Sequence, residues 1–332
     1  SHLAVAAAMT LTEQAQTQDG LLATDPTTPV EGRRQRRLAA ESASTSPATA
    51  RPPLAVGRVA VAWALACVSL LAFGFVGYAL LLSPVQEQRS QAVLYHTLRE
   101  QLALQTAPLG GPIKPGTVVA LLSAPEVGIV DQVVVEGTAS GDLMAGPGHR
   151  RDTVLPGQAG VSVLYGRATL FGAPFGRIAG ARSGDRITVT TGQGVFTYVV
   201  QGVRRARDPM PQPLHGLQGR LTLVTSTGEG RFAGLMPDGA VYLDAALTGD
   251  GQATLPGRPA AVPLAEQAMQ GDPSALLGLA LALPLLLIGV LVALVGWTRW
   301  GRWQTWVIGL PLVVLGLWMS AQAAIQLFPN LL

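Results

Sequence analysis

Few residues in this sequence have side chains that commonly act as nucleophiles, proton-transfer groups or metal ligands. The chain of 332 residues holds one cysteine and four histidines. The cysteine, Cys67, lies inside a long uncharged apolar stretch, so we expect no disulfide, and any chemistry outside a membrane proceeds without a thiol. No His, Cys or carboxylate cluster has metal-ligand spacing, and no glycine-rich loop of the phosphate-binding type occurs. We therefore predict no metal and no cofactor.

Three apolar stretches carry no charged side chain, and together they account for a hydrophobic content of 48% against 13% charge. They are Val59–Gln86, Pro273–Thr298 and Trp303–Leu332. Each exceeds the ~20 residues that a membrane-spanning helix requires. We predict transmembrane helices over 58–83, 273–298 and 303–328. Pro284 and Pro311 do not argue against them, because neighbouring groups satisfy the freed carbonyls in membrane helices.

The arginines predict how these helices are oriented. Six of them precede the first stretch, and two separate the second from the third: Arg33, Arg34, Arg36, Arg37, Arg51, Arg58, Arg299 and Arg302. The positive-inside rule then makes the N-terminal segment cytoplasmic and the region between the first two spans extracytoplasmic, at a plasma membrane. The cluster Arg33–Arg37 is also a possible nucleic-acid-binding patch. A role in fixing the membrane topology explains the cluster with fewer assumptions, so we predict no nucleic-acid partner.

The polar segments divide into four parts. Residues 1–57 have few large apolar groups, which predicts a disordered tail. Apolar residues at near-helical spacing predict an amphipathic stalk helix over 84–107. Residues 108–247 hold short β-rich runs separated by Gly, Pro and Asp, and 248–272 form a Gly- and Pro-rich linker.

The β-rich runs predict a single barrel or sandwich. They are Val118–Ser123, Val133–Glu136, Val161–Leu164, Ile187–Thr191, Val195–Val203, Leu221–Thr225 and Val241–Asp244.

Several motifs occur in a specific order within this region. They are VVVEGT at Val133–Thr138, GPGHRRDT at Gly146–Thr153, VSVLYGRATLFGAPF at Val161–Phe175, and LTLVTS at Leu221–Ser226. In this order they resemble the sortase family, in particular the class E sortases of actinobacteria. The resemblance covers about Val118–Leu247. It implies a mainly β fold, a sortase-like eight-stranded β-barrel, here accompanied by three transmembrane α-helices.

The residues on which sortase chemistry depends are replaced at the matching positions. The family uses a Cys nucleophile, a His that moves the proton and an Arg that steadies the oxyanion. Those positions fall on Ser226, Arg167 and Ala240. A serine hydroxyl is a poor nucleophile without a base, and an arginine cannot accept a proton in a working cycle. Arg231 is close enough in sequence to replace the missing arginine.

A different base would rescue the serine. In the sortases that the sequence resembles, the GPGH loop lies beside the groove, so His149 oriented by Asp152 would give Ser226 a Ser-His-Asp set. The alternative is that His149 closes a turn beside Arg150 and Arg151 and never approaches the strand end.

We predict a pseudo-sortase, not an enzyme, that binds the peptide tail of a secreted or membrane partner. The implied cleft contains Tyr165, Arg167 and Arg231, with Phe171 and Phe175 nearby. The two phenylalanines are alternatively core residues, and Arg167 alternatively pairs with a surface acid. Two other functions stay open: an active transpeptidase or hydrolase using Ser226, and a structural subunit of an oligomer or envelope complex that acts through its membrane helices.

Overall fold

The computed structural model describes residues 56–228, 237–299 and 302–332 of the chain. The predicted tail over 1–57 falls outside these ranges except for its last two residues. Arg231 falls outside them as well.

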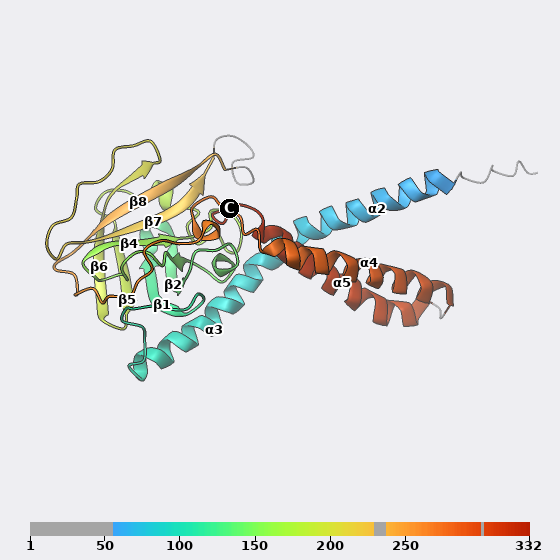
Figure 1. The fold of residues 1–332 in the computed structure, drawn as a ribbon, viewed down its shortest axis with the longest axis horizontal. Coiled ribbons are helices and arrows are strands. Elements are labelled where there is room, and N and C mark those ends of the chain that lie inside the picture. Colours follow the sequence, from blue (N-terminus) through green and yellow to red (C-terminus); the bar gives the residue numbers. More distant parts are fainter. Residues whose placement is uncertain (1–55, 229–236, 300–301) are drawn as a thin grey trace, which may run out of the picture. The chain divides into compact units, whose positions relative to one another are not determined.

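Eight strands close into one barrel (Figure 1), in the order β1-β2-β3-β4-β7-β8-β6-β5. They are β1 Val118–Ala124, β2 Ile129–Glu136, β3 Gly148–His149, β4 Gly160–Tyr165, β5 Arg186–Thr191, β6 Gly194–Arg205, β7 Gly219–Thr227 and β8 Gly239–Leu247. This is the predicted eight-stranded barrel. Each predicted run lies within a strand, and the sequence missed only the two-residue β3.

The pairing of β4, β7 and β8 brings several singled-out residues to one end of the barrel. β4 runs parallel to β7, with Tyr165 opposite Val224, and β7 runs antiparallel to β8, with Ser226 opposite Ala240. Side chains alternate across a strand. Leu221 and Leu223 enter the buried barrel core, whereas Val224 belongs to a separate cluster outside it. Ser226, two residues beyond Val224, therefore shares this outer face.

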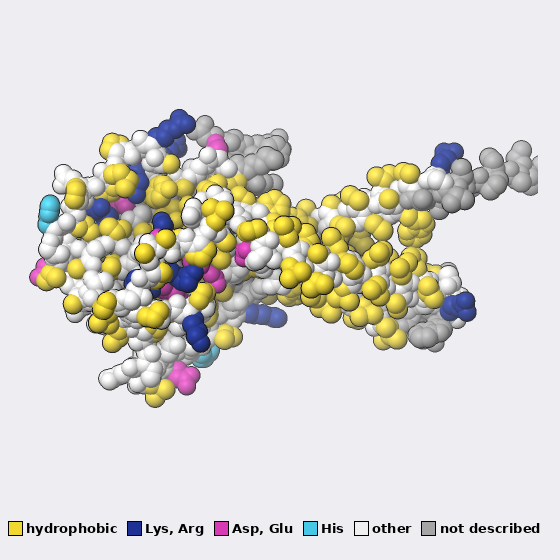
Figure 2. Space-filling model, viewed as in Figure 1, with side chains coloured by type: hydrophobic (Ala, Val, Ile, Leu, Met, Phe, Trp, Pro, Cys, Tyr) yellow, Lys and Arg dark blue, Asp and Glu magenta, His cyan; other side chains and the backbone are white. Residues whose placement is uncertain are grey.

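Among the described residues, three long apolar helices are candidate membrane spans. The first is continuous through α2 Val56–Gly77, a π-helical turn at Tyr78–Leu82 and α3 Ser83–Ala103, and the others are α4 Ala275–Arg299 and α5 Arg302–Gln326. The visible surfaces of α4 and α5 are almost wholly hydrophobic (Figure 2). The third helix ends earlier than its predicted end at residue 328, and the residues after it turn back to the barrel.

Small residues allow α4 and α5 to pack closely on each other. An added Cβ at Gly309 would lie 2.9 Å from the side chain of Ala293, and one at Gly316 would lie 2.9 Å from the backbone of Leu286. These glycines therefore serve packing within the chain, as small residues do at membrane helix contacts.

The C-terminal part of the first helix, α3, packs on the barrel that follows it in the sequence. Leu98 of α3 is buried in a cluster with Val118 and Val133. The side-chain amide of Gln91 donates to the carbonyls of Val133 (3.1 Å) and Ala145 (2.7 Å), and its oxygen accepts from the Val133 amide at 2.7 Å. One glutamine thus satisfies backbone groups of β2 and attaches the stalk to its own barrel.

The segment between β8 and α4, predicted as a linker, is also attached to the barrel. Arg258 pairs with the fully buried Glu136 of β2. The Arg151 Nε donates to Glu266 at 2.9 Å, and the Thr138 hydroxyl donates to the Glu266 carbonyl at 2.6 Å. Three side-chain contacts hold this segment along the barrel wall.

Candidate functional site

An apolar cluster on the outer face of the barrel surrounds the end of β7. It contains Tyr165 of β4, Val224 of β7 and Ala240 of β8, together with Leu143 and Leu331. Leu331 comes from the residues after α5, so chain from the far end of the sequence contributes to the wall of this site. We call residues 327–332 the return segment.

Ser226 lies within this cluster and has 7% of its surface exposed. Its hydroxyl donates a 2.8 Å hydrogen bond to the backbone carbonyl of Leu331. The same carbonyl accepts from the backbone amide of Ala168 at 2.9 Å. The serine therefore gives its proton to a peptide group, not to an imidazole.

Asn330 anchors the return segment through its side chain. The amide nitrogen Nδ2 donates to the carbonyl of Thr138 at 2.8 Å and to that of Gln267 at 3.0 Å. The Asn330 backbone amide donates to the Gln270 carbonyl at 2.9 Å. Asn330 and Leu331 are both completely buried, so the return segment fills the space beside Ser226.

Arg167 is also completely buried, directly after β4. Its guanidinium donates from Nη2 to the carbonyl and hydroxyl oxygens of Ser140 (2.8 and 2.9 Å), from Nε to the Leu143 carbonyl (3.3 Å) and from Nη1 to the Leu332 carbonyl (3.5 Å). It also lies 5.0 Å from the ring centre of Phe171. Burial lowers the pKa of Arg167 to about 10, which leaves it charged at neutral pH. The hydrogen-bond acceptors of this buried guanidinium are backbone oxygens and the Ser140 hydroxyl, not the carboxylate of a surface Asp or Glu, so the alternative of a surface acid is wrong.

The structure does not bring His149 to Ser226. The imidazole is completely buried, with Nδ1 2.9 Å from Glu136 and Nε2 2.8 Å from the Val154 carbonyl. Asp152 pairs with Arg150 at 2.8 Å. β3 pairs with β2 so that His149 lies opposite Glu136, and the imidazole contacts this buried carboxylate. The Ser-His-Asp arrangement considered from the sequence is therefore absent.

The remaining predicted site residues occupy simpler positions. Ala240 faces Ser226 across the β7–β8 pair and places a methyl group where an oxyanion-binding arginine was expected. Tyr165 is buried, and burial raises the pKa of its phenol. Phe175 belongs to the barrel core, and Phe171 to a cluster that includes Leu332, so the core interpretation holds for both.

An open groove of about 540 Å³ continues along the outer face from the cluster around Leu331. Its floor comes from β4, β7 and β8, and its walls from β6, the loop after β6 and the segment after β8. The lining residues are Arg150, Val161, Val163, Tyr165, Arg204, Ala206, Met210, Thr222, Val224, Tyr242, Gln267 and Ala268. Tyr165 and Val224 belong both to this groove and to the Leu331 cluster, so the filled and open parts adjoin.

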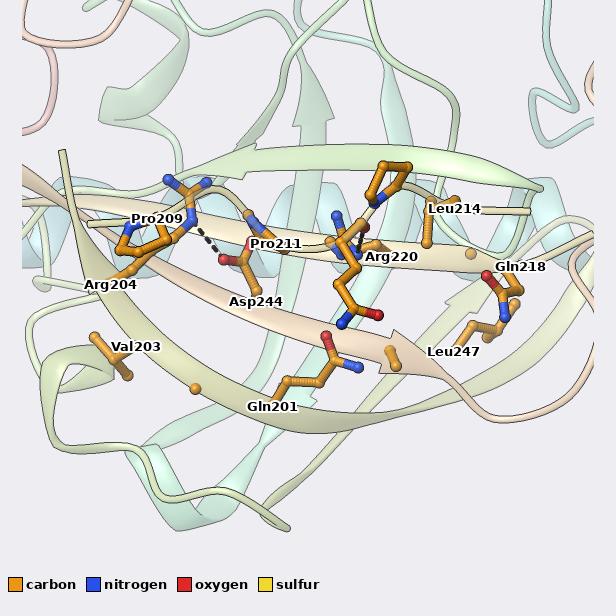
Figure 3. A pocket seen from close by; sticks show the side chains of 15 residues that line it. Gln201, Val203, Arg204, Pro209, Pro211, Leu214, Gln218, Arg220, Asp244 and Leu247 are labelled. Carbon is orange, nitrogen blue, oxygen red and sulfur yellow. Dashed lines mark hydrogen bonds and ion pairs between the residues drawn. The ribbon is translucent and has the colours of Figure 1, made fainter. Parts of the chain in front are cut away.

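A second hollow of about 480 Å³ lies further along the same face (Figure 3). Arg204 lines both hollows. It pairs with Asp244 at 2.6 Å and stacks on Tyr242 at 4.4 Å, and Asp244 also accepts from the Thr222 hydroxyl at 2.7 Å. This network separates the two hollows and leaves the Arg204 charge neutralised.

Within the described ranges, no group of three or more His, Cys, Asp or Glu residues is placed to hold a metal ion. The sequence reasoning missed the return segment and the groove residues Arg204 and Tyr242. Pro329 was the available signal for the return segment, because proline is common shortly after the end of a helix. It is a weak signal, since α5 itself contains Pro311, and it does not say where the chain goes next.

Comparisons with known proteins found similarities in the barrel region. The family model described as "Sortase domain" matches residues 122–231. Similar solved structures include a sortase D5 transpeptidase from Clostridium perfringens (23% identity, 48% of this chain, 99% of that chain, TM-score 0.39). Others are a SrtA sortase from Actinomyces oris (23%, 42%, 85%, 0.36) and sortase E from Streptomyces avermitilis (25%, 41%, 91%, 0.34). No curated protein matches the sequence. Residues 122–231 thus match a sortase domain model, and the described part of the chain also holds three candidate membrane helices.

Proposed function

We propose that this protein is a membrane-held, catalytically inactive sortase-fold protein that binds an extended peptide of a secreted or membrane partner along its outer groove. The observation that carries the proposal is the hydrogen bond from Ser226 to a peptide carbonyl beside a buried Arg167. The arginine distribution supports an extracytoplasmic barrel, and the resemblance to class E sortases supports a place at a bacterial envelope.

The geometry supports inactivity because each catalytic requirement lacks its group. Acyl transfer needs a base within hydrogen-bond reach of the nucleophile. The Ser226 hydroxyl instead donates to Leu331. The side chain at the sequence position of the family's base is a guanidinium that already donates hydrogen bonds to three residues, and a charged guanidinium cannot accept a proton.

The groove favours a largely apolar peptide that is recognised by side chains. β7 is hydrogen-bonded on both edges, to β4 and to β8, so a partner cannot add a strand to it. Tyr165, Tyr242 and Val224 offer apolar contact area. Arg204 is paired with Asp244, and Arg150 is paired with a neighbouring carboxylate, so the groove has little net attraction for an anion.

The experiment uses the full chain in detergent micelles or nanodiscs. A set of sorting-type peptides is incubated with an amine acceptor, and products are followed by liquid chromatography and mass spectrometry. We expect no cleavage and no transfer product. Turnover that disappears in a Ser226→Ala variant would overturn the inactive assignment.

Binding is measured separately with fluorescently labelled peptides. We expect a peptide that binds to lose at least tenfold in affinity in a Tyr242→Ala variant. Tyr95→Ala is the matched control, because Tyr95 is an exposed tyrosine on α3 that does not line the groove. Equal losses in both variants would remove the groove as the binding site.

A further inference from the structure

The space beside Ser226 is filled by the return segment of the same chain, which lies there as a bound peptide would. We propose that this space is a binding site for a segment with an asparagine followed by two apolar residues, that Asn330–Leu332 is its resident ligand, and that a partner segment of the same chemistry enters by displacing it. This inference rests on the peptide-binding function proposed above and names the peptide class that the site accepts.

The first position of the site selects a side-chain amide. Asn330 is completely buried, and Nδ2 uses both of its hydrogens on the carbonyls of Thr138 and Gln267. Two carbonyl oxygens facing one side-chain atom require a donor there. An aspartate of the same shape would place a carboxylate oxygen against them and leave the two acceptors without hydrogens. The position therefore distinguishes Asn from Asp.

The second position reads the peptide backbone as well as an apolar side chain. The Leu331 carbonyl accepts two hydrogen bonds, from the Ser226 hydroxyl and the Ala168 amide. Its side chain is completely buried against Tyr165, Val224 and Leu143. The backbone contacts are available to any residue, whereas the enclosed pocket rejects a charged or polar side chain.

The third position is apolar and next to a positive charge. Leu332 packs in a cluster with Phe171, Leu170 and Ile325. Its carbonyl lies 3.5 Å from the Arg167 guanidinium, which also binds the loop at Ser140. Arg167 thus holds the end of the segment and one wall of its site at the same time.

The open groove gives a competing segment a place to begin. It shares Tyr165 and Val224 with the Leu331 pocket, so a peptide lying in the groove reaches the filled site without crossing another barrier. A segment attached to the protein has a high effective concentration, so a competitor needs additional contacts to displace it. The groove of about 540 Å³ provides the room for those contacts.

The test places a reporter thiol under the return segment. In a Cys67→Ser background, Ser226→Cys creates a thiol that Leu331 covers, and its rate of reaction with a maleimide measures how often the segment leaves. We expect slow labelling with the native segment and at least tenfold faster labelling after Leu331→Ser or Asn330→Asp. Leu264→Ser is the control, because Leu264 is 61% exposed and does not line the site; it should not change the rate.

A synthetic peptide with the sequence of residues 326–332 tests the ligand class. We expect it to slow labelling again in the Leu331→Ser variant, and we expect the same peptide with Asp at the asparagine position to give no protection. Thermal melts of each variant report folding. Asn330→Asp changes the shape of the side chain least, so it decides the result if Leu331→Ser does not fold.

Three labelling outcomes overturn the inference: fast labelling with the native segment, no acceleration in a folded Asn330→Asp variant, and equal protection by the Asn and Asp peptides. A fourth overturning outcome comes from a crosslinking experiment. A double variant, Ser226→Cys with Leu331→Cys, shows whether the bound segment comes from the same chain or from a second copy, because the two introduced thiols can form a disulfide. An intrachain bond supports the inference, and a dimer assigns the ligand to a second copy and contradicts it. The labelling rate does not depend on catalysis. An unexpected labelling result would therefore contradict the displacement proposal without contradicting the inactive assignment. Turnover of sorting peptides would contradict the inactive assignment without changing the labelling result.

Discussion

Removing the Arg167 guanidinium is the sharpest test of what this residue does. In an Arg167→Ala variant the acceptors on Ser140, Leu143 and Leu332 lose their donor inside the protein, and the side-chain volume is left empty. Each buried acceptor that is left without a donor costs about 1–3 kcal/mol, and the empty volume adds a cavity cost, so we expect a loss of about 3–5 kcal/mol in the free energy of unfolding. At about 2–4 °C per kcal/mol for chains of this size, the melting temperature should fall by about 6–20 °C.

Two further substitutions separate charge from hydrogen-bond geometry. Arg167→Lys keeps the charge but has no planar fork, so it should recover only part of the loss. Arg167→Met fills the volume and leaves all the acceptors unpaired, so it should be nearly as damaging as alanine.

The assay is thermal unfolding of the full chain in detergent micelles, and the intrinsic fluorescence of the aromatic residues reports unfolding. Arg186→Ala is the matched control, because Arg186 is an exposed arginine on β5. A melting temperature for Arg167→Ala within about 2 °C of this control, the shift expected for less than about 1 kcal/mol, would refute the structural role of the guanidinium. So would a methionine variant as stable as the native protein.

Three further outcomes are expected. A Ser226→Cys variant should form no acyl adduct with sorting peptides by intact mass spectrometry, because a thiol without a base is not enough; an adduct of the expected mass would contradict this. Arg258→Ala leaves the Glu136 carboxylate buried without its guanidinium, so we expect the melting temperature to fall by about 6 °C or more, and a fall below about 2 °C would argue against the pair as an anchor. Burial, together with the nearby Glu266 charge, raises the pKa of Asp142 from its ordinary value of 3.8 to about 6. The stability that protonated Asp142 contributes is therefore fully present below about pH 4 and is lost as the pH rises to about 6. Melting temperatures should decline between about pH 4 and 6 and level off above about pH 6, and Asp142→Asn should remove this decline.

The barrel was predictable because its strands have strong local signals. Runs such as Leu221–Thr225 and Ile187–Thr191 alternate β-branched and apolar residues between Gly, Pro and Asp, and they became β7 and β5. β3 was missed because a two-residue strand has no period to detect. The three apolar helices were predictable for the same reason, since length and absence of charge need no tertiary information.

The site was less predictable because its key contacts join residues far apart in sequence. The motif order placed Ser226 and Arg167, but nothing local indicates that Leu331 covers one and Leu332 meets the other. His149 was considered as a base because of its position in a loop. Only the β2–β3 pairing shows that the His149 imidazole contacts Glu136.

Under the proposed inactive function, the burial of Arg167 also limits how sortase-type catalysis could be introduced into this protein. A histidine at this position is too short to replace a guanidinium that donates to three separate residues, so Arg167→His should lose stability even as it adds a base. A cysteine at Ser226 meets a peptide carbonyl already seated 2.8 Å from the hydroxyl. On this proposal neither substitution alone supplies catalysis, and the two positions and the segment that covers them would have to change together.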